Sequence, residues 1–550
     1  MKKSVIKDFK SAMEKLGNMK DHATDSITLA VSISDRRHRA DVKFIRATSF
    51  KRAWEPIEGL LAKAPQNAWI RIEVVHSVQR KRRTQLEQAL HEMTRMNYWR
   101  QGVSFDADFK TALLEMEING HEFFNQGKGH VVGKGRSESW IDYQQVTKYL
   151  RRRNGQLSFD IESSEYVWLF TTSGIFSDGE QIWVLNDTET AEKGVRRLEN
   201  PKKELQSYLV AGEAFLTRQI KEDGKFIYGY YPGLQRILSN YNSVRHFSSV
   251  YALLEAIDFT GNYEDTRRAK KALQWGIDHL TLNHQHEKKP LLFVVEKRKQ
   301  GTDEIKLGAQ AMLILALCKY QEVTKDASFL RRLMEAFNAV VFFRQKSGRY
   351  NHVLNTDLTV KDEFRIIYYE GEITFALARL YELTQDEQVL KMVKQSLDFM
   401  VDNDYGKYHD HWISYAVNEA LQIFPNNREY MKLGLKNVFS HLDFIAKRDT
   451  SYPTLLELMN AAVKMTDIIK LTGNDDLLET YDLIRLRRIW KYRAEYELAT
   501  GSFQPELAMY FYAPYKFVGG FFARHDHFRT RVDDCEHFLS GLINYYKYTY

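Results

Sequence analysis

Cysteine and proline are scarce in this chain. Its 550 residues include only 2 cysteines, Cys318 and Cys535, and 9 prolines. Two cysteines allow at most one disulfide, which excludes the small disulfide-stapled folds of secreted proteins. The composition is 44% hydrophobic and 27% charged, and this balance excludes an intrinsically disordered chain.

Long apolar runs are also missing. The longest apolar stretches, such as residues 311–318, are too short to span a bilayer. Residues 1–8 carry charges with no apolar run behind them, so we expect no signal peptide. These absences predict a cytoplasmic protein without a transmembrane segment.

Nucleotide and nucleic-acid signatures are absent too. The sequence contains no P-loop and no GxGxxG motif, and it has no helix-turn-helix, zinc-finger or RNP-type motif. We therefore expect no cofactor and no nucleic-acid partner. Two His-x-His pairs, His409/His411 and His525/His527, are the obvious metal-ligand candidates, but we expect their spacing to be incidental and predict no metal.

The net charge is +7, and two basic clusters lie in the N-terminal part of the chain. Residues 80–83 read Arg-Lys-Arg-Arg and residues 151–153 read Arg-Arg-Arg. The simpler interpretation is solvated helix ends and turns. The functional alternative is contact with an anionic polymer, or docking to a membrane-bound assembly.

Residues 1–200 mix two hydrophobic periods and predict an α+β domain. Alternation typical of strands occurs at residues 27–34, 40–48 and 69–78, and again in a β-rich segment near residues 155–190 (157–170 and 181–185). Helical spacing occurs at residues 50–62, 83–96, 109–117 and 142–152.

From residue 201 to residue 550 the pattern is almost purely helical, and it repeats. An apolar helix is followed by a short turn, whose third position carries Asn or Asp, the preferred N-cap of a helix. The turns are Thr260-Gly261-Asn262, Thr324-Lys325-Asp326, Thr384-Gln385-Asp386, Pro425-Asn426-Asn427 and Thr472-Gly473-Asn474. An amphipathic helix follows each turn, so the repeat is a pair of helices.

Six apolar helices are expected at residues 244–259, 307–323, 371–383, 412–424, 455–471 and 536–548. An amphipathic helix at residues 203–219 precedes the first and can pair with the last. Six inner and six outer helices therefore close a ring. The fold class predicted for the chain is multidomain, with the N-terminal α+β domain followed by an all-α (α/α)6 toroid over residues 201–550.

Polar residues are concentrated where the inner helices begin. In an up-down ring these beginnings share one rim, and polar groups buried there must be paired or used. Residues at or near these beginnings are Tyr241, Asn242, Arg245, His246, Gln310, Glu370, Glu372, Asp410, His411, Trp412, Arg531, Asp533, Asp534 and His537; Tyr231 and Tyr350 lie in the loops before them. Aromatic faces beside polar groups suit the binding of a sugar ring.

This pattern resembles the (α/α)6-toroid carbohydrate enzymes, a group that includes N-acylglucosamine 2-epimerases and unsaturated glucuronyl hydrolases. The resemblance covers residues 201–550 and rests on Arg245-His246, on residues 369–372, on residues 409–412, and on residues 531–534 with His537. In the epimerases two facing histidines exchange a proton beside a sugar carbonyl, which implies such parts for His246, His411 and His537. In the glucuronyl hydrolases aspartates act as acid and base, which implies Asp410, Asp533 or Asp534 with Glu370 or Glu372.

The sequence thus predicts a carbohydrate-active enzyme that uses general acid/base catalysis on a glycan, either anionic or from a cell envelope or capsule. Hydrolase or lyase action by Glu372 with Asp534, from different helices, is one hypothesis. A sugar epimerase or isomerase that uses paired histidines among His246, His411 and His537 is the second. A non-catalytic protein that binds a glycan or peptide, or serves in assembly, is the third.

The remaining polar residues at these helix beginnings are predicted to bind substrate. They are Arg245, Tyr241, Asn242, Glu370, Asp410, Trp412, Arg531, Asp533, Tyr231, Tyr350 and Gln310. The acids discriminate between the hypotheses. If basic residues pair with all of them, the site only binds or is structural, whereas an unpaired acid facing a cavity favours catalysis.

Overall fold

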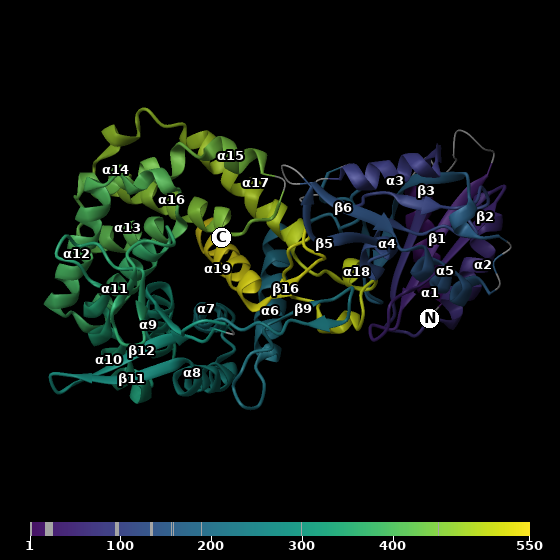
Figure 1. Ribbon diagram of the computed structural model, residues 1–550. Helices are drawn as coiled ribbons and strands as arrows, with labels where there is room; N and C mark the ends of the chain where they lie inside the picture. The colour runs from purple at the N-terminus through teal and green to yellow at the C-terminus, as the bar shows by residue number, and fades with distance from the viewer. Residues whose placement is uncertain are drawn as a thin grey trace.

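The computed structural model describes residues 3–16, 26–93, 98–132, 136–155, 157, 159–188, 190–298, 300–448 and 450–550. A sheet-containing N-terminal part lies beside a ring of helices (Figure 1). The chain runs through the N-terminal part first and then around the ring.

The N-terminal part is built on an antiparallel sheet with strand order β2-β1-β3-β7-β4, and β8 pairs with β7. The strands are β1 (Ile27–Ser34), β2 (Asp41–Ala47), β3 (Trp69–Arg82), β4 (Gly102–Ser104), β7 (Tyr166–Ser177) and β8 (Ile182–Val184). A separate hairpin joins β5 (Phe124–Val132) to β6 (Arg136–Ile141). The helices are α1 (Lys3–Lys15), α2 (Phe50–Lys63), α3 (Arg83–Glu92), α4 (Glu115–His121) and α5 (Tyr143–Asn154).

Most of the sequence-based elements in this part are observed. The strand expected at residues 27–34 has the same bounds as β1, and α2 and α5 lie within two residues of their predictions. The helix expected at residues 109–117 is wrong. Residues 109–114 form a turn and a bridge, because Asp106 accepts backbone N–H groups of Asp108, Lys110 and Thr111 and folds the segment locally.

The ring has two layers of helices. The inner helices are α7 (Ser243–Thr260), α9 (Leu307–Thr324), α11 (Tyr369–Thr384), α13 (His411–Ile423), α16 (Thr454–Leu471) and α19 (Val532–Thr549). The outer helices are α6 (Pro201–Gln219), α8 (Thr266–Leu280), α10 (Leu330–Val340), α12 (Glu387–Asp402), α14 (Arg428–Phe439) and α17 (Leu483–Gly501), with a short α15 (Leu442–Lys447) after α14.

Contacts between neighbouring inner helices run around the whole ring. Each inner helix packs on the next, and α19 packs on both α7 and α6, so the last pair of helices closes on the first. The (α/α)6 ring expected from the repeat is therefore observed (Figure 1). No helix among the described residues is both long and apolar enough to cross a membrane.

Burial on all sides explains why the inner helices carry almost no hydrophobic periodicity. In α9 every residue from Leu307 to Tyr320 is buried, against α7 and α11 on either side and α10 outside. In α8, by contrast, the buried residues follow helical spacing on one face: Ala269, Ala272, Leu273, Gly276, Ile277 and Leu280. The difference in amphipathicity that predicted the two layers thus reflects their positions in the ring.

The turns between inner and outer helices are capped partly as expected. Asp326, Asp386 and Asn427 accept backbone N–H groups at the start of the next helical segment. Asn262 and Asn474 do not. Their side chains bond other groups instead, including the carboxylate of Glu213 for Asn262.

The expectation of an almost purely helical region after residue 201 needs correction. An antiparallel sheet of β11 (Thr281–His286), β12 (Lys289–Glu296), β13 (Glu304–Lys306), β14 (Val353–Asn355) and β15 (Val360–Asp362) lies over the segments that lead to α9 and α11. Residues 291–295 of β12 are apolar and all buried. A short apolar run of this kind is compatible with strand or helix, and its burial decides for the strand. A smaller sheet joins β9 (Gly229–Tyr231), β10 (Arg236–Ile237) and β16 (Thr530–Arg531).

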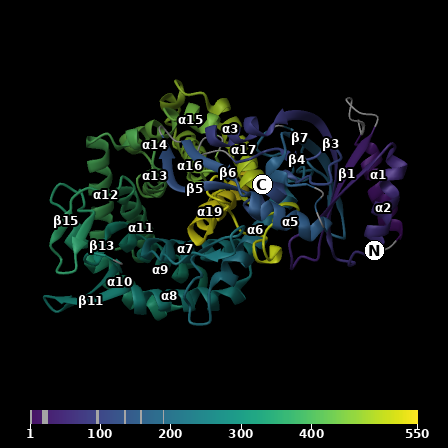
Figure 2. The same cartoon turned by 45° about the vertical axis from the view of Figure 1, so that its right-hand side comes forward.

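The segment between α17 and α19 packs against the N-terminal sheet. In Figure 2 its yellow ribbon lies between the ring and the N-terminal strands. Phe503, Phe511 and Tyr510 share one hydrophobic core with Phe170 and Phe176 of β7. The guanidinium of Arg196 forms an ion pair of 2.7 Å with the buried carboxylate of Glu506. The chain therefore crosses from the first part to the ring near residue 200, but residues from beyond 500 complete the core of the first part.

Candidate functional site

The six inner helices begin at one end of the ring. Because an outer helix returns the chain after each inner helix, all six run in the same direction. We call this end, defined by the first turns of α7, α9, α11, α13, α16 and α19, the bowl.

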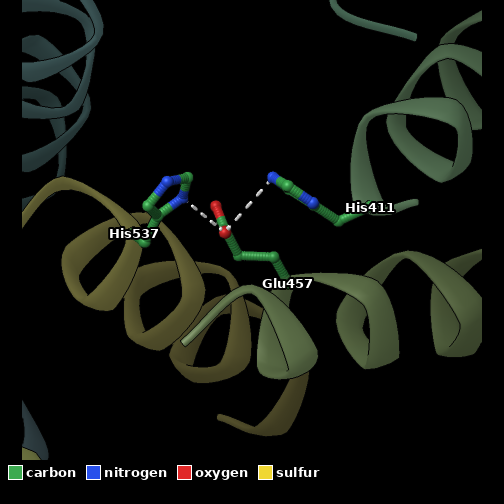
Figure 3. A group of neighbouring side chains, drawn as sticks. All are labelled: His411, Glu457 and His537. Carbon is green, nitrogen blue, oxygen red and sulfur yellow. Dashed lines mark hydrogen bonds and ion pairs between the residues drawn. The ribbon is translucent and has the colours of Figure 1, made fainter. Parts of the chain in front are cut away.

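Three side chains from three inner helices converge in the bowl (Figure 3). His411 begins α13, Glu457 lies in the first turn of α16, and His537 lies in the second turn of α19. The Nδ1 atom of His537 donates to Glu457 Oε2 at 2.8 Å, and the same oxygen lies 3.8 Å from His411 Nε2. The ring centroids of the two histidines are 5.5 Å apart. One carboxylate is thus shared between two imidazoles.

Three further side chains, Asp410, Glu536 and Tyr415, contact this trio. Asp410 Oδ1 lies 3.4 Å from His411 Nδ1, and Glu536 Oε2 lies 3.5 Å from His537 Nε2. The hydroxyl of Tyr415 donates to the other oxygen of Glu457 at 3.3 Å. Each histidine therefore has a carboxylate on either side, which orients its ring.

The two histidines have opposite pKa shifts. Burial lowers the pKa of His411 well below its usual value, and the charge of His537 adds to this. Burial alone would also lower the pKa of His537, but the carboxylates of Glu536 and Glu457 raise it to about 10. At neutral pH the site therefore holds one neutral and one cationic imidazole, which are a proton acceptor and a proton donor.

Glu372, on α11, is a buried acid of the bowl with a raised pKa. Burial raises the pKa of its carboxyl to about 8, and the nearby charge of His537 partly opposes this. Its Oε2 atom is buried without a hydrogen-bond partner. A Cβ on Gly308 of α9 would lie 2.2 Å from that oxygen, so only glycine leaves room for this carboxyl.

Asp410 combines a structural role with a high pKa. Its Oδ1 accepts the backbone N–H of Trp412 at 3.0 Å and caps α13. Burial raises the pKa of Asp410 well above its usual range, although that N–H bond opposes the shift. Its Oδ2 has no hydrogen-bond partner and packs where a Cβ on Gly371 would collide with it.

The aspartates at the start of α19 are held by arginines. Asp533 lies 2.7 Å from Arg245 Nε and 3.2 Å from Arg531 Nε. Asp534 accepts hydrogen bonds from Arg531 Nη2 at 2.8 Å and from Arg531 Nε at 3.1 Å. Burial alone would raise the pKa of Asp534, but the charge of Arg531 keeps it below its usual value. The predicted catalytic residue Asp534 is thus a paired carboxylate, and its predicted partner Glu372 is not.

His246 and Tyr241 face the outer helix α8 and lie away from the trio. The Nε2–H of His246 donates to the carbonyl of Ala272 at 2.9 Å, so its Nδ1 accepts from the Tyr241 hydroxyl at 2.8 Å. The same hydroxyl accepts the backbone N–H of Phe226. Burial lowers the pKa of His246 to about 4. This arrangement is that of a hydrogen-bonded core histidine.

Gln310, Glu370 and Tyr350 also lie between the two layers. Gln310 Oε1 accepts the N–H of Val294, and its amide donates to the carbonyls of Leu292 and Ala336, so it ties α9 to β12 and α10. Glu370 Oε1 accepts the N–H of Tyr350 at 3.4 Å and lies 3.6 Å from His352 Nε2. Tyr350 bonds Ser396 of α12 through its hydroxyl.

The other predicted binding residues have varied positions. Asn242 caps α7 by accepting the N–H of Arg245 at 3.1 Å. Trp412 is buried, and its ring packs beside Phe375. Tyr231 lies on β9, where the guanidinium of Arg236 covers its ring.

Behind the trio, a cavity of about 210 Å³ extends along the inside of the ring. Every inner helix contributes a charged residue to its lining: Glu255, Lys319, Arg379, Glu419, Glu457 and Glu536. Glu322 also lines the cavity, and it forms ion pairs with both Arg379 and Lys319. Glu457 therefore contacts the two histidines of the trio on one side and this polar cavity on the other.

Neither His-x-His pair converges on one point. His409 is turned towards the carbonyl of Asn437 and stacks on His441 at 4.3 Å, and His527 donates to Glu122 Oε2. The ligand atoms of His411, Glu457 and His537 instead lie within 4.8 Å of one another, and within the described part of the chain this is the group that a metal ion could bridge.

Glu457, Glu536 and Tyr415 are site residues that the sequence analysis missed. Glu457 stands inside the apolar stretch of residues 455–459, in a helix that is otherwise buried. A carboxylate in such a position must be paired or used, so its apolar neighbours were the signal that could have identified it.

No protein-family model matches the chain, and no curated protein matches its sequence. Among solved structures, it is similar to a cellobiose 2-epimerase from Bacillus thermoamylovorans, with 13% identity and a TM-score of 0.46 over 63% of this chain and 99% of that one. A D-mannose isomerase has 12% identity and a TM-score of 0.48 over 63% and 98%. A GH76 α-mannanase from Bacteroides thetaiotaomicron has 10% identity and a TM-score of 0.42 over 64% and 99%.

Proposed function

We propose that the ring is a carbohydrate-active enzyme that moves a proton at the carbon beside the carbonyl of a reducing sugar, as an epimerase or isomerase does. His411 removes the proton from that carbon, and His537 supplies a proton. Returning a proton to the other face of the same carbon gives epimerisation. Returning it to the former carbonyl carbon, while the proton of the neighbouring hydroxyl passes to the former carbonyl oxygen, gives isomerisation. In each case the proton count balances without a co-reactant.

The sharing of Glu457 by two imidazoles is the observation that supports this proposal. Proton transfer to and from carbon needs a base and an acid within reach of one substrate atom. The two histidines come from different helices, their ring centroids are 5.5 Å apart, and they differ in protonation state. The side chain of His537 is 23% exposed, so this imidazole is accessible from solvent.

The state of the acids argues for catalysis rather than binding alone. Arg245 and Arg531 pair with Asp533 and Asp534. Among the described residues, no lysine or arginine forms an ion pair with Glu372, whose Oε2 is buried without a partner. An uncompensated buried carboxyl of this kind is typical of a group retained for its chemistry.

Glycosidic cleavage is the second candidate, and Glu372 supports it. A carboxyl whose pKa is about 8 is protonated at neutral pH and can serve as a general acid. Its partner would be Asp410 on the neighbouring helix α13, since the charge of Glu372 contributes to the raised pKa of Asp410. Asp534 is the weaker partner because Arg531 already holds it.

The test is exchange of carbon-bound hydrogen in D2O. The purified full chain is incubated with a panel of reducing sugars that includes N-acetylhexosamines, neutral hexoses, disaccharides and uronic acids, and the C2 proton signal is followed by NMR. We expect loss of that signal with at least one sugar, and a loss of activity of about 10²- to 10⁴-fold in His411→Asn and His537→Asn.

His246→Asn is the matched control, because it removes an imidazole of the same ring that lies outside the trio. Exchange that survives in both His411→Asn and His537→Asn would contradict the proposal. Release of sugar from a glycan that depends on Glu372 and not on the histidines would favour the second candidate.

For the N-terminal part we propose docking to an anionic surface through residues 80–83 and 151–153. Arg151 and Arg152 are exposed, whereas Arg153 forms an ion pair with Glu117 and Arg82 forms one with Glu165. Binding to vesicles with anionic lipid should weaken when Arg151 and Arg152 are changed to Gln. Unchanged binding in that variant would contradict docking through this cluster.

A further inference from the structure

We propose that His411 Nε2, Glu457 Oε2 and His537 Nδ1 together bind a divalent transition-metal ion of the Zn²⁺ class, and that the ion inhibits the ring. Binding of the ion does not depend on the proposed function, whereas inhibition rests on it. The two His-x-His pairs, which the sequence offers as ligands, are not part of this site.

The spacing of the ligand atoms suits such an ion. Two ligands on a tetrahedral zinc site are about 3.3 Å apart, since each metal–ligand bond is about 2.0 Å. Here Glu457 Oε2 lies 2.8 Å from His537 Nδ1 and 3.8 Å from His411 Nε2, and all three atoms lie within 4.8 Å of one another. Small rotations of the two imidazoles would bring all three to bonding distance.

A buried nitrogen without a partner independently indicates a ligand. His411 is 4% exposed, and its Nε2 makes no hydrogen bond. A buried polar atom without a partner destabilises the folded state. The nitrogen points towards Glu457 and His537, as Figure 3 shows, so an ion bound between the three would satisfy it.

The surroundings of the trio are those of a metal site. Metal-binding histidines usually direct their second ring nitrogen to a carboxylate or carbonyl, which fixes the ring and strengthens its basicity. Asp410 lies 3.4 Å from the second nitrogen of His411, and Glu536 lies 3.5 Å from that of His537. Tyr415 fixes the carboxylate of Glu457 in the same way.

The ligand types select the ion. Two imidazoles and one carboxylate favour Zn²⁺, Co²⁺, Ni²⁺ or Cu²⁺, while Mg²⁺ and Ca²⁺ prefer sites made of oxygen. Three protein ligands leave a fourth position for water or substrate. An ion held here takes the nitrogen lone pairs that proton transfer needs, and therefore it inhibits.

The test is metal binding to the full chain, dialysed against a chelator and without any sugar. Titration with Co²⁺ is followed by visible absorption, and titration with Zn²⁺ by calorimetry. We expect one ion per chain, and at least tenfold weaker binding in His411→Ala and His537→Ala. His409→Ala is the control, because it removes a histidine two positions from His411 that faces Asn437, and we expect its affinity to be unchanged.

No stoichiometric binding, or binding that His409→Ala weakens and His411→Ala does not, would overturn the inference. Circular dichroism checks that each variant is folded, and Glu457→Gln, with the same shape, adds a second ligand test. If Zn²⁺ binds as expected but no sugar exchanges its proton, the metal site stands and the proposed function falls. If sugars exchange their proton but no variant weakens metal binding, the proposed function stands and the metal site falls.

Discussion

Two groups of carboxylates lie in the bowl, and they differ in what holds them. Asp533 and Asp534 are each paired with a guanidinium, from Arg245 and Arg531. Glu457 is paired with imidazoles, and Glu372 has a buried oxygen with no partner. Arginine does not lose its proton in a protein, so the first group is fixed in its charged state. Imidazoles and unpaired carboxyls can change charge, and for this reason we place proton transfer in the second group.

The largest effect expected from this comparison follows Glu457→Gln. Removing the shared carboxylate takes away one of the two carboxylates that raise the pKa of His537, the other being Glu536, so the acid of the pair is protonated over a narrower range of pH. We expect kcat to fall by about 10²-fold or more, with little change in KM. Steady-state kinetics over a range of pH measure both quantities.

Glu370→Gln is the matched control for Glu457→Gln, since Glu370 is a buried carboxyl on the same end of the ring that faces the outer layer. Equal losses of kcat in the two variants, with no change in the pH profile of Glu457→Gln, would remove the distinction between the two groups.

Asp534→Asn should act mainly on stability. It leaves the partly buried guanidinium of Arg531 without its strongest partner, and the side chain of Arg531 is 18% exposed. We expect a loss of roughly 2–3 kcal/mol in the free energy of unfolding, below the range for fully buried pairs because solvent screens part of the charge. Urea unfolding measures this loss.

Activity per folded molecule should fall less than tenfold in Asp534→Asn. A fall as large as that of Glu457→Gln, in a variant that keeps its stability, would move Asp534 into the catalytic group. It would also restore the pair of Glu372 and Asp534 that the sequence suggested.

Glu372→Gln should change how stability depends on pH. The folded chain keeps the proton of Glu372 up to a pKa of about 8, whereas the unfolded chain loses it near 4.5. Between these values each pH unit costs the folded state about 1.4 kcal/mol. Relative to the unchanged protein, Glu372→Gln should therefore gain roughly 2 kcal/mol in unfolding free energy between pH 5 and pH 7.

Urea unfolding at several pH values gives this difference for Glu372→Gln. A constant difference between pH 5 and pH 8 would show that the Glu372 carboxyl has an ordinary pKa and belongs with the paired acids. Lost activity together with gained stability would be typical of a group kept for function.

The smallest effect is expected for Asn242→Ala, which removes the cap of α7. Loss of an N-cap costs about 1 kcal/mol, and Asn242→Asp should preserve most of it because Asp also caps well. Thermal unfolding of the two variants measures the difference. A loss of activity in both variants with no loss of stability would return Asn242 to the substrate-binding residues.

The sequence was sufficient to predict the ring and the end of it at which polar side chains converge. The apolar inner helices and their partners produce a repeat that can be read without coordinates, and α7, α9 and α16 lie where this repeat places them. Strands β11 to β15 were hidden, because their short apolar run is ambiguous between helix and strand.

The membership of the site could not be predicted in full. Successive residues of a helix point about 100° apart, so the rotation of each helix decides which residue faces the bowl. Glu370 faces the outer layer, whereas Glu372, two residues later, lies close enough to His537 for the charge of that ring to lower the pKa of the Glu372 carboxyl. His246 and His411 look alike in sequence, but only the structure shows that Ala272 and Tyr241 saturate the first.

The most direct test of the account is the protonation state of the two histidines that share Glu457. Imidazole nitrogen shifts in a ¹⁵N-labelled full chain at pH 7, with His411→Asn and His537→Asn to assign them, report each ring separately. The account predicts a neutral His411 and a cationic His537 in the same molecule. Two neutral rings, or two rings that titrate together near pH 6.5, would contradict it.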